Sequence, residues 1–110
     1  MTDFLDFTGK TALITGAASG IGAACARFLA DRGVASLVVT DRDAAGLAVL
    51  DLPCALRRVA GDVGDPAHWD EVSRHLDGLD HAVLNAGVAG AGAQVRNQLE
   101  KVVQRNRQHG

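Results

Sequence analysis

Three glycines between residues 16 and 22 form the motif in this sequence that is best suited to chemistry. The segment contains Thr15, Gly16, Ala17, Ala18, Ser19, Gly20, Ile21 and Gly22. It follows an apolar run and precedes a helical pattern, so we expect it at a helix N-terminus. A pyrophosphate reaches the unpaired N–H groups there where no Cβ intervenes. We expect Gly16 to permit the tight turn, Gly20 the close approach, and Gly22 tight packing of helix on strand. Glycines at a ligand-free helix start are the alternative.

A carboxylate follows the first of these glycines by 25 residues, from Gly16 to Asp41, at the end of a second apolar run. In that position it can accept hydrogen bonds from the adenosine ribose hydroxyls of a dinucleotide while repelling a 2′-phosphate. The pattern therefore favours NAD over NADP. Arg42, the next residue, works against this preference because its charge suits a 2′-phosphate.

Strands and helices are expected to alternate over the first 84 residues and to position these groups. Apolar runs of strand length occupy residues 10–15, 35–40, 56–60 and 80–84. Helices are expected at about 21–32, at 44–50 and from 66 to 78, with Asp43 and Asp65 as N-caps. The first helix is expected to bury one apolar stripe, formed by Ile21, Cys25, Phe28 and Leu29. Short connections and right-handed crossovers then predict an α/β fold, a parallel sheet with helices on both faces.

The composition changes near residue 93. We expect residues 1–93 to form the nucleotide-binding part and residues 94–110 to form a basic helical tail of the same domain, with a local charge of +3. Val95, Leu99, Val102 and Val103 have the spacing of one helix face. A covering helix with a solvated basic side is the expectation, and a partner-binding arm is the alternative.

The overall composition restricts the function. The chain has 110 residues, a formal charge of −2 and no Tyr. It has no basic excess for nucleic acid or anionic lipid, and it contains no apolar run long enough to span a membrane. We therefore expect a cytoplasmic protein with no nucleic-acid or membrane partner. Cys25 and Cys54 are expected to be reduced, and the four histidines lack the spacing of a metal pair, so no metal site is expected.

The order and spacing of the motifs over residues 8 to about 90 resemble the short-chain dehydrogenases/reductases. The glycine motif follows the first expected strand, and Asp41 follows the second. Asp62 and Val63 follow the third strand, and the fourth ends at Asn85, Ala86 and Gly87. The resemblance implies a Rossmann-like three-layer sheet of about four strands in the order 3-2-1-4, truncated relative to the full family fold.

The resemblance also implies a role for each motif. Residues 15–22 would hold the pyrophosphate, with Ile21 beneath the cofactor, and Asp41 and Arg42 would meet the adenosine ribose. Asp62 and Val63 would flank the adenine. The segment from Asn85 to Gly87 would line the approach to the nicotinamide ribose.

The catalytic groups of that family are absent from this sequence. The family uses a Ser, a Tyr and a Lys downstream of the Asn-Ala-Gly segment. This sequence has no Tyr, and its Lys residues are Lys10 and Lys101. Asn106 is a candidate remnant of the family's helical Asn. We therefore expect the NAD(H)-binding part of an alcohol or carbonyl oxidoreductase that does not transfer hydride by itself.

Two other interpretations remain open at this point. One is a non-catalytic nucleotide-binding or assembly module, and the other is a methyltransferase-like fold that binds S-adenosylmethionine. A homo-oligomer is also expected, because the family pairs the fourth strand with a fifth that is absent from this sequence. The strand at 80–84 would then have an apolar edge without a neighbour.

Overall fold

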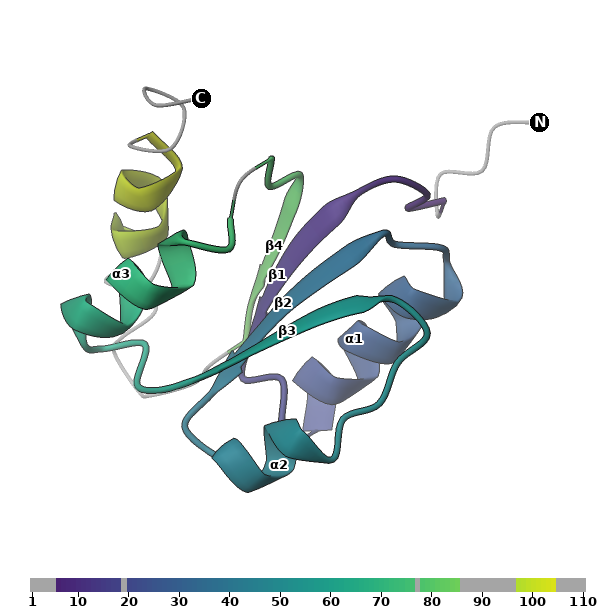
Figure 1. The fold of residues 1–110 in the computed structure, drawn as a ribbon, viewed down its shortest axis with the longest axis horizontal. Coiled ribbons are helices and arrows are strands. Elements are labelled where there is room, and N and C mark those ends of the chain that lie inside the picture. The colour runs from purple at the N-terminus through teal and green to yellow at the C-terminus, as the bar shows by residue number, and fades with distance from the viewer. Residues whose placement is uncertain (1–5, 19, 77, 86–96, 105–110) are drawn as a thin grey trace.

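The computed structural model describes residues 6–18, 20–76, 78–85 and 97–104. Its strands are β1 (Thr11–Thr15), β2 (Ser36–Asp41), β3 (Ala55–Ala60) and β4 (His81–Leu84). They form one parallel sheet in the order β3-β2-β1-β4 (Figure 1). The register sets Leu13 of β1 between Val38 of β2 and Ala82 of β4. The α/β fold and the strand order 3-2-1-4 are therefore confirmed.

Three helices connect these strands, close to their expected positions. They are α1 (Gly20–Asp31), α2 (Ala44–Ala48) and α3 (Pro66–Ser73). Asp43 and Asp65 cap α2 and α3 as expected, each accepting a backbone N–H of the first turn. α3 ends at Ser73, before the expected end at Gly78. No described helix has both the length and the apolar character needed to cross a membrane.

The helices form two layers, one on each side of the sheet (Figure 1). α1 and α2 cover one side, called the α1 face below. α3 covers the other side, the α3 face, together with residues 97–104, which are helical. Side chains alternate along each strand, so Ile14 of β1 packs on the α1 face and its neighbour Leu13 on the α3 face.

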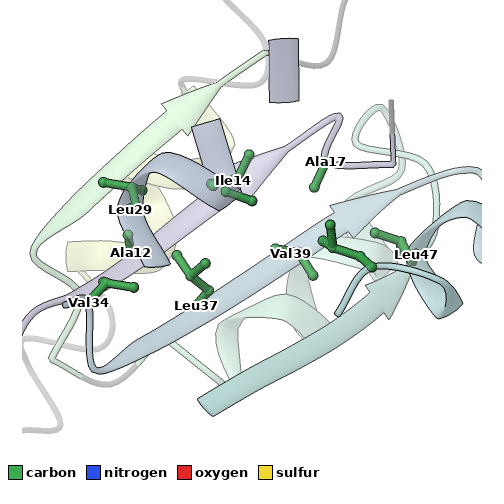
Figure 2. Packing of buried hydrophobic residues seen from close by; sticks show 10 residues of the cluster. Ala12, Ile14, Ala17, Leu29, Val34, Leu37, Val39 and Leu47 are labelled. Atoms are coloured by element: carbon green, nitrogen blue, oxygen red, sulfur yellow. The ribbon is translucent and has the colours of Figure 1, made fainter. Parts of the chain in front are cut away.

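The core of the α1 face combines branched strand residues with small helix residues. Figure 2 shows strand side chains of this cluster, among them Ile14, Leu37 and Val39, around Leu29 of α1 and Leu47 of α2. The buried positions of α1 are Gly22, Ala23, Ala26, Leu29 and Ala30. Because four of these five have at most a methyl side chain, the helix lies close to the sheet.

The expected apolar stripe of α1 is confirmed at Leu29, which is buried in this core, and at Cys25, which packs against it, but it is wrong at the other two positions. Ile21 is 71% exposed and Phe28 is 42% exposed. Leu29 and the small residues face the sheet, and the small residues allow a closer approach than Ile21 or Phe28 would. Ile21, Ala24, Cys25, Phe28 and Leu29 line a surface cavity of about 550 Å³ together with Val83 of β4. We call this cavity the α1 groove.

The α3 face is filled by larger side chains. Trp69, Val72 and Leu76 are buried, as are Leu99 and Val102 from the helical residues 97–104. Leu99 and Val102 thus place the helical residues 97–104 against this face of the sheet. Val95, the first residue of the helix face expected in the tail, lies outside the described residues.

β4 is less covered than β1, the strand beside it. His81, Ala82 and Leu84 are exposed, and Val83 is half-buried. Among the described residues β4 pairs with β1 alone. The Thr11 N–H donates to the Asp80 carboxylate at 2.9 Å, and the Asp80 N–H donates to the Thr11 carbonyl at 2.9 Å, which fixes the start of this strand.

Candidate functional site

The glycine motif forms the loop between β1 and α1. Gly16 and Gly20 have φ angles of +68° and +55°, in the left-handed region that favours glycine. A Cβ on Gly20 would meet no protein atom within 4 Å, whereas a Cβ on Gly22 would lie 2.0 Å from the Gly16 carbonyl oxygen. Gly22 thus lets α1 rest on the loop, and Gly20 leaves open space at the helix start. Thr15 is buried beneath the loop, and Ser19 lies outside the described residues.

The Asp41 carboxylate accepts two backbone N–H groups, one of them from this loop. Its Oδ2 accepts the Ala18 N–H at 3.0 Å, and its Oδ1 accepts the Asp43 N–H at 2.9 Å. The carboxylate is half-buried, while Arg42 beside it is exposed. The end of β2 and the glycine motif therefore meet at one carboxylate whose orientation is fixed.

Asn85 reaches the same loop from β4. Its N–H donates to the Thr15 hydroxyl oxygen at 2.9 Å, and its Nδ2 lies 3.5 Å from the Gly16 carbonyl oxygen. A Cβ on Gly22 would be 3.0 Å from that Nδ2. Asn85 therefore packs beside the first and last glycines of the motif. Ala86 and Gly87 lie outside the described residues, as does Asn106.

Asp62 and Val63 follow β3 at the carboxyl ends of the strands, and the exposed fractions of the two residues differ. The Gly61 N–H donates to the Asp41 carbonyl at 2.9 Å, which joins the end of β3 to the end of β2. The Asp62 carboxylate is exposed and accepts the Gly64 N–H at 2.8 Å. Val63 is 5% exposed and packs in the α3-face core. Its side chain therefore offers little surface to a ligand.

One contact behind the carboxyl ends of the strands was not expected from the sequence. The Thr40 Oγ1 lies 2.6 Å from the His68 Nε2, and both residues are buried. Burial lowers the pKa of His68, and the negative charges of Asp65, Asp62 and Glu71 partly oppose that shift. No spacing rule pairs Thr40 with a histidine 28 residues away. The one available signal is the position of His68 next to Trp69 on the buried side of α3.

The described residues thus bring together the ends of all four strands. Asp41 and Asn85 each contact the glycine loop, and the residue before Asp62, Gly61, is hydrogen-bonded to Asp41. In an open parallel sheet, ligands bind in the crevice outside the carboxyl ends of the strands. These polar groups and the open space before α1 therefore form one candidate site.

The family model described as "short chain dehydrogenase" matches residues 10–108. A curated relative, the cis-4-hydroxycyclohexanecarboxylate dehydrogenase of Sinomonas cyclohexanicum, is 40% identical over 90 residues, which cover 76% of this chain and 36% of the relative. A hydroxyacyl-CoA dehydrogenase of Mycobacterium tuberculosis is 39% identical over 100 residues, which cover 79% of this chain and 31% of the relative.

Solved structures give the same result. The L-sorbose reductase of Gluconobacter frateurii, in complex with NADPH and L-sorbose, superposes with a TM-score of 0.80 at 27% identity. That match covers 96% of this chain and 51% of the reductase. The chain spans about a third of the length of the curated relatives it matches. With strand order, loop and family model in agreement, the chain belongs to the short-chain dehydrogenase family.

Proposed function

We propose that this chain is the NAD(H)-binding part of an alcohol or carbonyl oxidoreductase. The observation that carries the proposal is the Asp41 carboxylate, fixed by the Ala18 N–H at 3.0 Å beside the glycine loop. A fixed carboxylate at this point suits the two hydroxyls of an unphosphorylated ribose. Membership of the family supports the class of reaction.

The residues present suit a dinucleotide. The space before α1 that a Cβ on Gly20 would enter is open, and α1 has no acidic residue in its first turn to oppose an anion. The loop from Gly16 to Gly22 would hold the pyrophosphate, and Asp41 the adenosine ribose. Asp62 and the Val63 backbone would flank the adenine, and Asn85 the nicotinamide ribose. When bound, the nicotinamide ring supplies the position that accepts or releases hydride.

The preference for NAD over NADP rests on charge. Asp41 would repel a 2′-phosphate, and Arg42 is the one neighbour in sequence that would attract it. The L-sorbose reductase binds NADPH, so membership of the fold does not decide between the two cofactors. We assign the preference to Asp41 because its carboxylate is fixed at the loop, whereas Arg42 is exposed.

The proposal includes cofactor binding without turnover by this chain alone. The sequence contains no Tyr and has Lys only at positions 10 and 101. It therefore lacks the tyrosine and lysine pair that would move a proton to or from a substrate oxygen as hydride moves. In an enzyme of the relatives' length, other residues would form the substrate-binding part and would determine which substrate is bound.

The proposal also covers self-association of the chain and its location in the cell. Copies of the chain are proposed to associate through the edge of β4, which pairs with β1 alone among the described residues. A cytoplasmic location is supported by Cys25 and Cys54, which are both free.

Calorimetric titration of the 110-residue chain with NAD+, NADH and NADP+ tests the proposal. We expect NAD+ and NADH to bind more tightly than NADP+. In Asp41→Asn the affinity for NAD+ should fall about 10- to 100-fold, because hydrogen bonds to a charged acceptor are lost. The affinity for NADP+ should fall less, since the repulsion is also removed.

The matched control is Asp51→Asn, which removes the same charge from an exposed position in the loop between α2 and β3. It should leave all three affinities unchanged. Binding of none of the three dinucleotides by the wild-type chain would contradict the proposal, and binding of S-adenosylmethionine instead would favour the methyltransferase-like alternative.

A further inference from the structure

A buried histidine lies directly behind the proposed adenosine end of the site. His68, in the first turn of α3, is 7% exposed. Its Nε2 is 2.6 Å from the hydroxyl of Thr40, which is fully buried at the end of β2. Thr40 immediately precedes Asp41, the carboxylate proposed to meet the ribose. The ring is therefore hydrogen-bonded to the residue that immediately precedes this carboxylate in β2.

The same ring also supports the residue after β3. A Cβ on Gly61 would lie 2.2 Å from His68 Nδ1 and 2.7 Å from Cε1. The ring therefore occupies the space that any side chain at position 61 would need. Gly61 immediately precedes Asp62, and its N–H donates to the Asp41 carbonyl. One imidazole thus contacts both segments of the adenosine end.

The neighbouring side chain fixes the other end of this short segment. The Trp69 indole N–H donates to the Val63 carbonyl at 2.8 Å, and Trp69 is 1% exposed. His68 and Trp69, consecutive in α3, therefore hold Gly61 and Val63 on either side of Asp62. With both neighbours fixed, the position of Asp62 is set by α3 and not by the loop alone.

We propose that His68 is a positioning residue for the adenosine half of the dinucleotide, acting through the Thr40 hydroxyl on Asp41 and through Gly61 on Asp62. The imidazole acts through these neighbours and does not itself contact the cofactor. Its contribution is to hold two carboxylate-bearing segments from different strands in one fixed arrangement before the ligand arrives. A site that is already ordered loses less conformational entropy on binding. The inference rests on the proposed function and names a residue that the motif pattern does not include.

The test compares ligand affinities of folded variants of the full 110-residue chain. Calorimetry with NADH and with ADP-ribose is done at pH 8 and well below each variant's unfolding temperature. His68→Leu should weaken both ligands by a similar factor, about tenfold, because the affected contacts are on the adenosine side. His68→Gln, whose amide can bond Thr40, should recover affinity to within about threefold of wild type.

Two further variants complete the design. Thr40→Val removes the hydroxyl but keeps the shape of the side chain, and it should weaken both ligands as His68→Leu does. It also tests the inference if His68→Leu does not fold. His75→Gln, a matched change at a half-buried histidine near the end of α3, should bind like wild type.

The outcomes separate the two levels of the argument. Wild-type binding of both ligands with unchanged affinity in folded Thr40→Val and His68→Leu would overturn the inference alone and leave His68 with a structural role. A wild-type chain that binds neither ligand would overturn the proposed function and, with it, the inference.

Discussion

The two faces of the sheet bury their helices by opposite means. On the α1 face the helix buries Gly22, three alanines and Leu29, and its exposed side chains Ile21 and Phe28 line the α1 groove. On the α3 face Trp69 and Val72 are fully enclosed. Small residues bring α1 onto the glycine loop, whereas large residues anchor α3 behind Asp62. The α1 face is therefore adapted to close approach, and the α3 face to holding a segment in place.

The largest loss of stability is expected on the α3 face. Trp69→Ala should lower the free energy of unfolding by about 3–5 kcal/mol, because it leaves a cavity in a closely packed cluster and an unpaired Val63 carbonyl. Urea unfolding followed by far-ultraviolet circular dichroism measures this. Trp69→Phe, the control, keeps most of the burial and should lose less than half as much. Equal losses in the two variants would show that the hydrogen bond, and not the volume, dominates.

On the α1 face we expect a larger side chain at a closely packed position to lower the free energy of unfolding. Gly22→Ala places a methyl group 2.0 Å from the Gly16 carbonyl oxygen, so α1 must move away from the loop. Overpacking of this kind costs about 1–3 kcal/mol. Ala24→Gly, at an exposed position of the same helix, should cost about 1 kcal/mol through helix propensity alone and leave NADH affinity unchanged. If Gly22→Ala retained both stability and NADH affinity, close approach would not be the role of this face.

The faces should also differ in their response to pH. His68, on the α3 face, is the one titratable side chain among the buried described residues. Burial lowers its pKa from the ordinary value of 6.5, so the unfolded chain takes up the proton first as the pH falls. Stability should therefore be complete above about pH 6.5 and decrease between that value and the lowered folded-state pKa. Unfolding midpoints at pH 7.5, 6.5 and 5.5 measure the decrease, and it should be smaller in His68→Gln. An unchanged slope in that variant would assign the decrease to other groups.

The smallest change in stability is expected at β4, which neither layer fully covers. Leu84→Lys adds a charge to an exposed position of this strand, so the free energy of unfolding should change by about 0.5 kcal/mol or less. Association through the strand edge should weaken, since lysine on an edge opposes pairing. Size-exclusion chromatography with light scattering measures the mass. Val49→Lys, at an exposed residue that follows α2, is the control and should not change it. A wild-type chain that stays monomeric at high concentration would contradict association.

The sequence was a good guide to the sheet and a poorer one to the helix surfaces. The parallel sheet with helices on both faces followed from the alternation of apolar runs and helices, whereas the strand order 3-2-1-4 followed from the resemblance to the short-chain dehydrogenases/reductases. The buried face of α1 followed only in part: Leu29 is buried as expected, but a stripe that includes Ile21 and Phe28 takes no account of how closely glycine and alanine approach a sheet. The motif pattern also predicts a carboxylate at the end of the second strand, where Asp41 is the last residue of β2. The bond from the Ala18 N–H and the contact of Thr40 with His68 depend on distances between elements, which no local pattern contains.

The pairing of β4 has a consequence for the order of assembly. β1 meets β2 across 25 residues, from Thr11 to Ser36, whereas the bond from Thr11 to Asp80 closes a separation of 69 residues. Closing the longer loop costs about 1 kcal/mol more in chain entropy. We expect the first three strands to form before β4 joins them. The segments around Asp41 would then be in place early. Asn85 would reach the loop only when the last strand pairs with β1. The two ends of one site would therefore form at different times during folding.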